Sequence, residues 1–118
     1  MAALTVQTIK GPHPSSVAAN SLDITLTAST PAGDTFASTG REILLVQNSD
    51  SGTQTFTVTS QPDSFNRTTT ILTTYSMAAG EFAAFWFGQV TGWRDSSGNV
   101  NLLSSDATIK YAVLRLPL

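Results

Sequence analysis

The chain has 118 residues, a formal net charge of −2 and charged side chains at only 12% of its positions. Nucleic-acid binding requires clustered Lys and Arg side chains, whereas those of this chain are scattered singly, so no nucleic-acid partner is expected. Because there is no cysteine, one domain spanning residues 1–118 has to be stabilised by its hydrophobic core, without disulfides.

The N-terminal residues 1–20 are expected to contain a strand at 4–9 and then an extended arm. Pro12 and Pro14 flank His13 and prevent regular sheet pairing there. The arm could carry the first strand to another subunit, or it could be a crossover loop within the domain. The first residues resemble no secretion signal and no apolar run is long enough to span a bilayer, so we expect no membrane contact.

Strict alternation of apolar and polar residues predicts a half-buried strand at 22–28, where Leu22, Ile24, Leu26 and Ala28 share one face. The following apolar run, at 43–46, is typical of a strand covered on both faces.

Residues 53–60 alternate again, which points Phe56 and Val58 inward and the threonines outward. The segment 48–52 is rich in turn residues and has the length of a hairpin loop. We therefore expect the strands on either side of it to pair antiparallel.

Further strands are expected at 67–74, 81–88, 98–103 and 107–116. The last of them is apolar on both faces, which indicates that its far end is buried on both sides or lies in an interface. About eight short strands separated by turns predict an all-β, single-domain, two-sheet antiparallel sandwich with jelly-roll or Greek-key connections.

The sequence offers few residues that could form a catalytic, metal-binding or cofactor-binding site. His13 is the single histidine and has no obvious partner, and the carboxylates fall mostly in turns, so no catalytic residue is predicted and we expect no enzyme. One histidine and no cysteine exclude an ordinary zinc site, and residues 95–99 favour a turn over a calcium loop. No glycine-rich phosphate loop follows a strand, so neither a metal nor a cofactor is expected.

Aromatic residues form the most distinctive group of side chains. Alternation places Phe85 and Phe87 on one face of their strand and Trp86 on the other, with Trp93 following in a loop. Core or interface packing is favoured because no polar set accompanies these rings. Stacking of tryptophan on sugar rings remains the alternative, which would make the chain a carbohydrate-binding or adhesin-like module.

Several blocks of the sequence are turn and strand patterns that together cover most of the chain. The blocks are residues 1–9, Gly33-Asp34-Thr35-Phe36, Gly40-Arg41 with the strand that ends at Asn48, 53–58, Ala78-Ala79-Gly80-Glu81 before the aromatic strand that ends in Gly88, 95–100 and 112–116. Taken together, these blocks resemble the small capsid decoration, or cement, proteins that tailed bacteriophages encode among their head genes.

The resemblance implies a structural virion protein that binds the outer surface of an icosahedral phage head, commonly as a trimer, and stabilises contacts between capsomers. Its partners would be the major capsid protein and copies of itself, after synthesis in the cytoplasm of a bacterial host. A head-completion or tail-junction role in the same virion is the neighbouring alternative. The interface candidates are apolar residues of the termini and of the aromatic segment: Leu4, Val6, Ile9, Phe85, Trp86, Phe87, Trp93, Leu114, Leu116 and Leu118.

Overall fold

The computed structural model describes residues 2–9, 23–59, 61, 75–86 and 93–116, and these residues form strands and turns without a helix. No described helix could therefore cross a membrane. The strands are β1 (Ala2–Ala3), β2 (Val6–Thr8), β3 (Thr27–Ala28), β4 (Asp34–Ala37), β5 (Glu42–Asn48), β6 (Gln54–Val58), β7 (Tyr75–Met77), β8 (Phe82–Trp86), β9 (Asn99–Ser104) and β10 (Ile109–Arg115).

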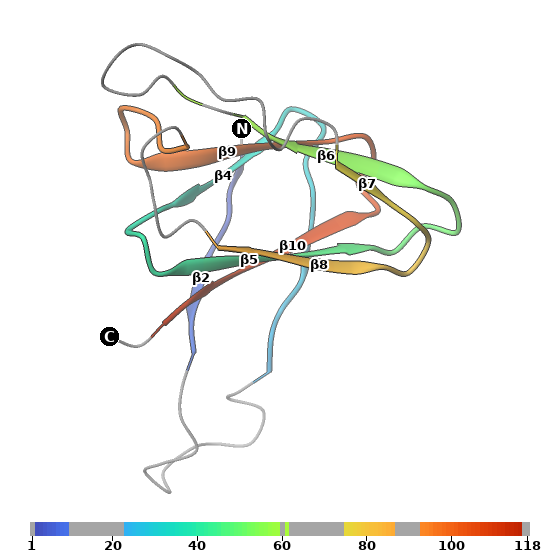
Figure 1. Ribbon diagram of the computed structural model, residues 1–118, viewed down its shortest axis with the longest axis horizontal. Helices are drawn as coiled ribbons and strands as arrows, with labels where there is room; N and C mark the ends of the chain where they lie inside the picture. Colours follow the sequence, from blue (N-terminus) through green and yellow to red (C-terminus); the bar gives the residue numbers. More distant parts are fainter. Residues whose placement is uncertain (1, 10–22, 60, 62–74, 87–92, 117–118) are drawn as a thin grey trace, which may run out of the picture.

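Two sheets face each other and form a sandwich (Figure 1). The first sheet has the order β1-β4-β9-β6-β7, and the second has the order β2-β10-β5-β8 with β3 also paired to β10. Strands β3 to β10 pair as nested antiparallel partners: β3 with β10, β4 with β9, β5 with β8 and β6 with β7. This nesting is the jelly-roll arrangement, so the predicted all-β sandwich class is confirmed.

The N-terminal strands make the sheets mixed, which the expectation of a purely antiparallel sandwich missed. β1 runs parallel to β4 in the first sheet, and β2 runs parallel to β10 in the second. Residues 2–8 thus pass from one sheet to the other and close that side of the sandwich within their own chain. Residues 10–22, which include most of the predicted arm and His13, lie outside the described residues.

The core lies between the two sheets and is filled by side chains that alternate inward along the strands. Phe56 is at its centre, with ring centroids 5.4 Å from Phe85 and 6.4 Å from Tyr111 in edge-to-face contacts. The buried core comprises Phe36, Leu44, Val46, Phe56, Val58, Met77, Val100, Leu102, Ile109, Tyr111 and Val113.

The predicted hairpin between β5 and β6 is wrong. β5 pairs with β10 and β8, whereas β6 pairs with β9 and β7, so these consecutive strands belong to opposite sheets. Leu44 of β5 and Val58 of β6 are both buried because each strand contributes its apolar side to the same core from opposite layers. The segment 49–53 is therefore a crossing between layers, although its composition is that of a hairpin loop.

The other strand predictions have mixed outcomes. A half-buried strand was predicted at 22–28, but among its described residues, 23–28, only β3 pairs, and Ile24 is exposed. The reason is that β2 takes the place beside β10 that a longer β3 would fill. β8, β9 and β10 are confirmed within a residue or two, while β4 and β7 were not predicted. The expected strand at 67–74, together with Phe87 and Gly88, lies outside the described residues.

Candidate functional site

The outer side of the second sheet carries an unusually apolar set of side chains. Leu44, Val46 and Tyr111 point into the core, so their neighbours along β5 and β10 point outward. On β8 the exposed residues alternate with half-buried ones in the same way. We call the resulting surface the apolar face; its members are Ile43, Leu45, Phe82, Ala84, Trp86 and Leu114, whereas Ala112 in the same register is buried.

Strand register arranges this apolar face in rows that run across β10, β5 and β8. Leu114 lies opposite Ile43, which lies opposite Trp86. The next row is Ala112, Leu45 and Ala84, and the third is Lys110, Gln47 and Phe82. Of these three rows, only the third contains polar side chains, those of Lys110 and Gln47, and it lies at one end of the surface.

Exposure is greatest at Phe82 and Trp86, the two aromatic residues of β8 that point outward. Trp86 is 70% exposed and Phe82 is 59% exposed, more than the other large hydrophobic residues of the described chain. Single exposed apolar residues are common, but neighbouring ones that continue an apolar row are typical of an interaction surface. The β8 end is thus the most accessible part of the apolar face.

The outer side of the first sheet has the opposite character. Thr35 lies opposite Asn101, Thr55 opposite Ser76, and Thr57 opposite Leu103. The alternating burial of β6 confirms that its threonines Thr55 and Thr57 face outward while Phe56 and Val58 face the core. The sandwich therefore has one outer side that is mostly polar and one that is mostly apolar.

The predicted interface residues separate into four groups. Trp86 and Leu114 lie on the apolar face, and Ile9 and Leu116 are exposed at the end of the β2 and β10 pair. Leu4, Val6, Phe85 and Trp93 instead pack against the core, so they support this domain and are not part of the apolar face. Phe87 and Leu118 lie outside the described residues. Ile43, Leu45 and Phe82 were missed because their outward direction depends on which strands pair.

Residues 95–99 form a turn held by Asp95. Its Oδ1 accepts hydrogen bonds from the N–H groups of Ser97 and Asn99, at 2.9 and 3.0 Å, and its Oδ2 accepts one from the Asn101 side chain. These hydrogen bonds, that from Asn101 first, lower the pKa of the Asp95 carboxyl. Gly98 has a φ of 85°, which glycine adopts readily. Asp95 thus serves the turn, and no cluster of three or more potential metal ligands occurs among the described residues.

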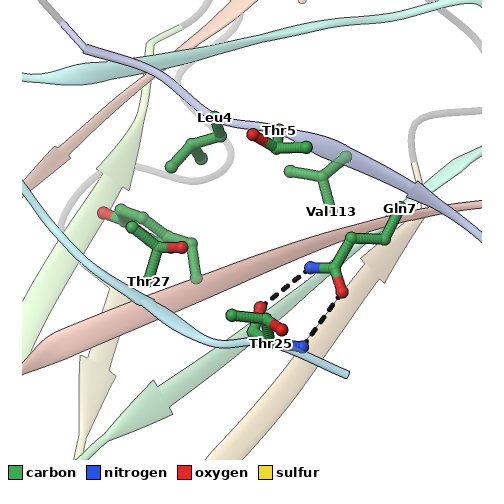
Figure 2. A pocket seen from close by; sticks show the side chains of 7 residues that line it. Leu4, Thr5, Gln7, Thr25, Thr27 and Val113 are labelled. Atoms are coloured by element: carbon green, nitrogen blue, oxygen red, sulfur yellow. Dashed lines mark hydrogen bonds between the residues drawn. The ribbon is translucent and has the colours of Figure 1, made fainter. Parts of the chain in front are cut away.

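A pocket of about 260 Å³ lies where β2 and the segment before β3 diverge over β10 (Figure 2). The hydroxyl-bearing Thr5, Thr25 and Thr27 line it together with the apolar Leu4 and Val113. At one end the Gln7 amide donates to the Thr25 carbonyl at 2.8 Å and accepts from the Thr25 N–H at 3.0 Å. The Gln7 side chain thus pairs with this backbone as a neighbouring strand would.

Replacement of Gln7 by alanine is expected to lower the free energy of unfolding by about 1 kcal/mol, because two exposed hydrogen bonds are lost and water replaces them in part. Urea denaturation of the variant measures this loss. Gln7→Glu is the informative companion, since its carboxylate accepts from Thr25 N–H but cannot donate to Thr25 C=O. A Gln7→Ala variant as stable as the wild type would contradict a clamping role.

Comparisons with known proteins found no similar family, protein or structure. No protein-family model matches the chain, and neither the curated proteins nor the solved structures include one with significant similarity. The fold and the surface together define a jelly-roll sandwich with one hydroxyl-rich and one apolar outer side.

Proposed function

We propose that the chain is a structural virion protein that decorates an icosahedral phage capsid and binds the shell through its apolar face. The observation that carries this proposal is the contrast between the two outer sides of the sandwich. A decoration protein needs one side that docks and one that remains in water, and jelly rolls are common among viral capsid proteins. The resemblance of the sequence to phage cement proteins supplies the kind of partner, namely the major capsid protein.

The composition of the docking side supports a protein partner over a glycan. Sugar binding combines an aromatic platform with polar groups for the hydroxyls. Trp86 instead has Ile43 as its cross-strand neighbour and Leu114 beyond it, and Trp93 packs against the core. The flat apolar rows are better suited to apolar side chains of a protein shell, with Trp86 and Phe82 as the anchors.

Binding to assembled shells tests this proposal. The chain is mixed with particles formed by the shell protein encoded near its own gene, and cryo-microscopy locates it; the resemblance predicts trimers at three-fold positions on the outer surface. The Trp86→Ser and Phe82→Ser double variant is expected to lose at least tenfold in affinity, because each anchor contributes on the order of 1–2 kcal/mol.

Leu103→Ser is the matched control, since it removes an exposed apolar residue from the hydroxyl-rich side. It should bind as the wild type does. Shells that stay bare, or binding that Leu103→Ser weakens as much as the double variant, would overturn the proposal. Density at a portal vertex would favour the head-completion role, and binding to a glycan array that Trp86→Ser abolishes would favour the adhesin-like module.

A further inference from the structure

In the part of the chain that the structure describes, one edge of the second sheet is open, and it belongs to the same strand that carries the exposed aromatic residues. Among the described residues β8 pairs only with β5, whereas at the opposite side of the sheet β10 is flanked by β2 and β3. Soluble proteins usually protect such edges with charged residues, prolines or bulges. β8 has the sequence Phe82-Ala83-Ala84-Phe85-Trp86 and contains none of these residue types.

The backbone groups on this open edge follow from the register. Asn48 N–H donates to the Glu81 carbonyl at 3.0 Å, so the Asn48 and Glu81 pair is hydrogen-bonded. In an antiparallel ladder the hydrogen-bonded pairs alternate with non-hydrogen-bonded ones. Ala83 and Phe85 therefore direct their N–H and C=O groups to β5. The corresponding groups of Phe82, Ala84 and Trp86 point away from the sheet.

The outward groups are spaced symmetrically about Ala84, and so are the side chains. Phe82 and Trp86 are large and aromatic, Ala84 between them is small, and all three lie on the apolar face. A two-fold contact requires a surface that is complementary to itself. A strand that reads aromatic, small, aromatic along its exposed side meets this requirement when a copy approaches antiparallel.

We infer that β8 pairs antiparallel with β8 of a second copy of this chain, with the two-fold axis at Ala84. Ala84 then lies opposite Ala84 of the second copy, and Phe82 lies opposite its Trp86 on both sides of the axis. Each of these is a hydrogen-bonded pair, so every outward N–H and C=O of β8 gains a partner. Cross-strand aromatic pairs form next to the axis, and the apolar faces of the two copies become one continuous surface.

The mass of the protein in solution gives the first test. Sedimentation over a concentration series should show an assembly whose mass falls by half in Ala84→Pro and in Ala84→Lys. The Ala84 N–H points away from β5, so proline removes no hydrogen bond within the domain, and proline is tolerated on edge strands. Ala84→Ser keeps the backbone pairing and should assemble as the wild type does. Far-ultraviolet circular dichroism verifies that each variant is folded.

Cross-linking gives a test that does not depend on the number of copies in the assembly. The chain has no cysteine, so Ala84→Cys introduces a single thiol at the proposed axis. Opposed residues in a hydrogen-bonded pair have Cα atoms about 5.5 Å apart, within reach of a disulfide. Mild oxidation should yield covalent dimers of Ala84→Cys, and Leu103→Cys on the other exposed side should remain monomeric on a denaturing gel.

A wild type that stays monomeric at every concentration would overturn the inference. So would an assembly whose mass is unchanged in both Ala84→Pro and Ala84→Lys, or an Ala84→Cys variant that cross-links no faster than Leu103→Cys. The inference does not rest on the capsid role, because it uses the isolated protein. A dimer that binds no shell would leave it standing while the proposed function failed.

Discussion

Replacing Asn48 by aspartate is expected to cost the domain roughly 3–5 kcal/mol of unfolding free energy at pH 7. Asn48 is fully buried at the end of β5. Its side-chain NH₂ donates to the carbonyls of Gly52 and Met77 at 2.9 Å and of Ala78 at 3.2 Å. Its Oδ1 accepts from the N–H of Asp50 at 3.0 Å. This one amide therefore joins the crossing between the layers to the turn between β7 and β8.

An aspartate at this position would place a carboxylate oxygen against three carbonyl oxygens that need a donor. Burial and these carbonyls would raise the pKa of the new carboxyl in the folded state. The folded state then binds more protons than the unfolded state, so the destabilisation should shrink as the pH falls from 7 toward 5. Urea denaturation across this range measures the trend.

Asn48→Ala is the matched control, because it removes the amide without adding a charge. It should cost about 2 kcal/mol with little dependence on pH between 5 and 7. If Asn48→Asp were no less stable than Asn48→Ala at pH 7, the amide would not be donating to these carbonyls. The comparison thus isolates the donor role from the loss of packing.

Acid is expected to destabilise the wild-type domain through Glu42, which is fully buried at the start of β5. Its carboxylate accepts hydrogen bonds from the Thr39 N–H at 2.6 Å, the Thr39 hydroxyl at 2.7 Å and the Arg115 Nε at 2.5 Å. Burial alone would raise the pKa of Glu42. The hydrogen bonds and the Arg115 charge outweigh it and lower the pKa from 4.5 to about 2.

A carboxyl whose pKa is lowered by folding stabilises the protein fully above its unfolded pKa and loses that stabilisation as the pH falls through the folded pKa. For Glu42 the loss should run from about pH 4.5 down to about 2 and amount to roughly 3 kcal/mol. Denaturation curves at pH 7, 4 and 2.5 measure it. Glu42→Gln should be less stable at pH 7 by a similar amount and should lack this acid-dependent slope.

Removing Arg115 tests the ion pair between Arg115 and Glu42 from its other partner. Arg115→Met replaces the arginine by an unbranched apolar side chain, which leaves the buried Glu42 carboxylate without its cation. The expected loss of unfolding free energy is roughly 3–5 kcal/mol at pH 7. Lys110→Met, on the same strand but on its outer side, is the control and should change stability by less than about 0.5 kcal/mol. An equal effect of the two substitutions would contradict a specific role of the ion pair.

The sequence predicted those parts of the fold that local alternation determines. The inward direction of Phe56 and Val58 and the position of β8 follow from a period of two, which every residue of a strand obeys. The choice of strand partners is different, because it depends on contacts between residues far apart in the chain. The segment 48–52 has the same turn-rich composition whether the chain reverses within one sheet or crosses to the other sheet. The antiparallel pairing of its two flanking strands was therefore wrongly predicted.

The candidate site was only partly predictable for the same reason. Trp86 could be chosen because alternation places it on the opposite face of its strand from Phe85, and Leu114 because the C-terminal segment is apolar on both faces. Ile43 and Leu45 belong to an apolar run that reads as buried on both sides, and they proved half-buried on the outer side. Their membership in the apolar face follows from the pairing of β5 with both β8 and β10, which no local pattern encodes.

The proposed contact between two β8 strands also limits how far pairing through this strand can proceed. A two-fold contact uses the outward N–H and C=O groups of β8 in both copies. Neither copy then keeps a free β8 edge to which a third copy could add. Addition through β8 therefore ends at a closed pair and cannot extend into a fibre, which allows the protein to keep an uncharged aromatic strand at its surface.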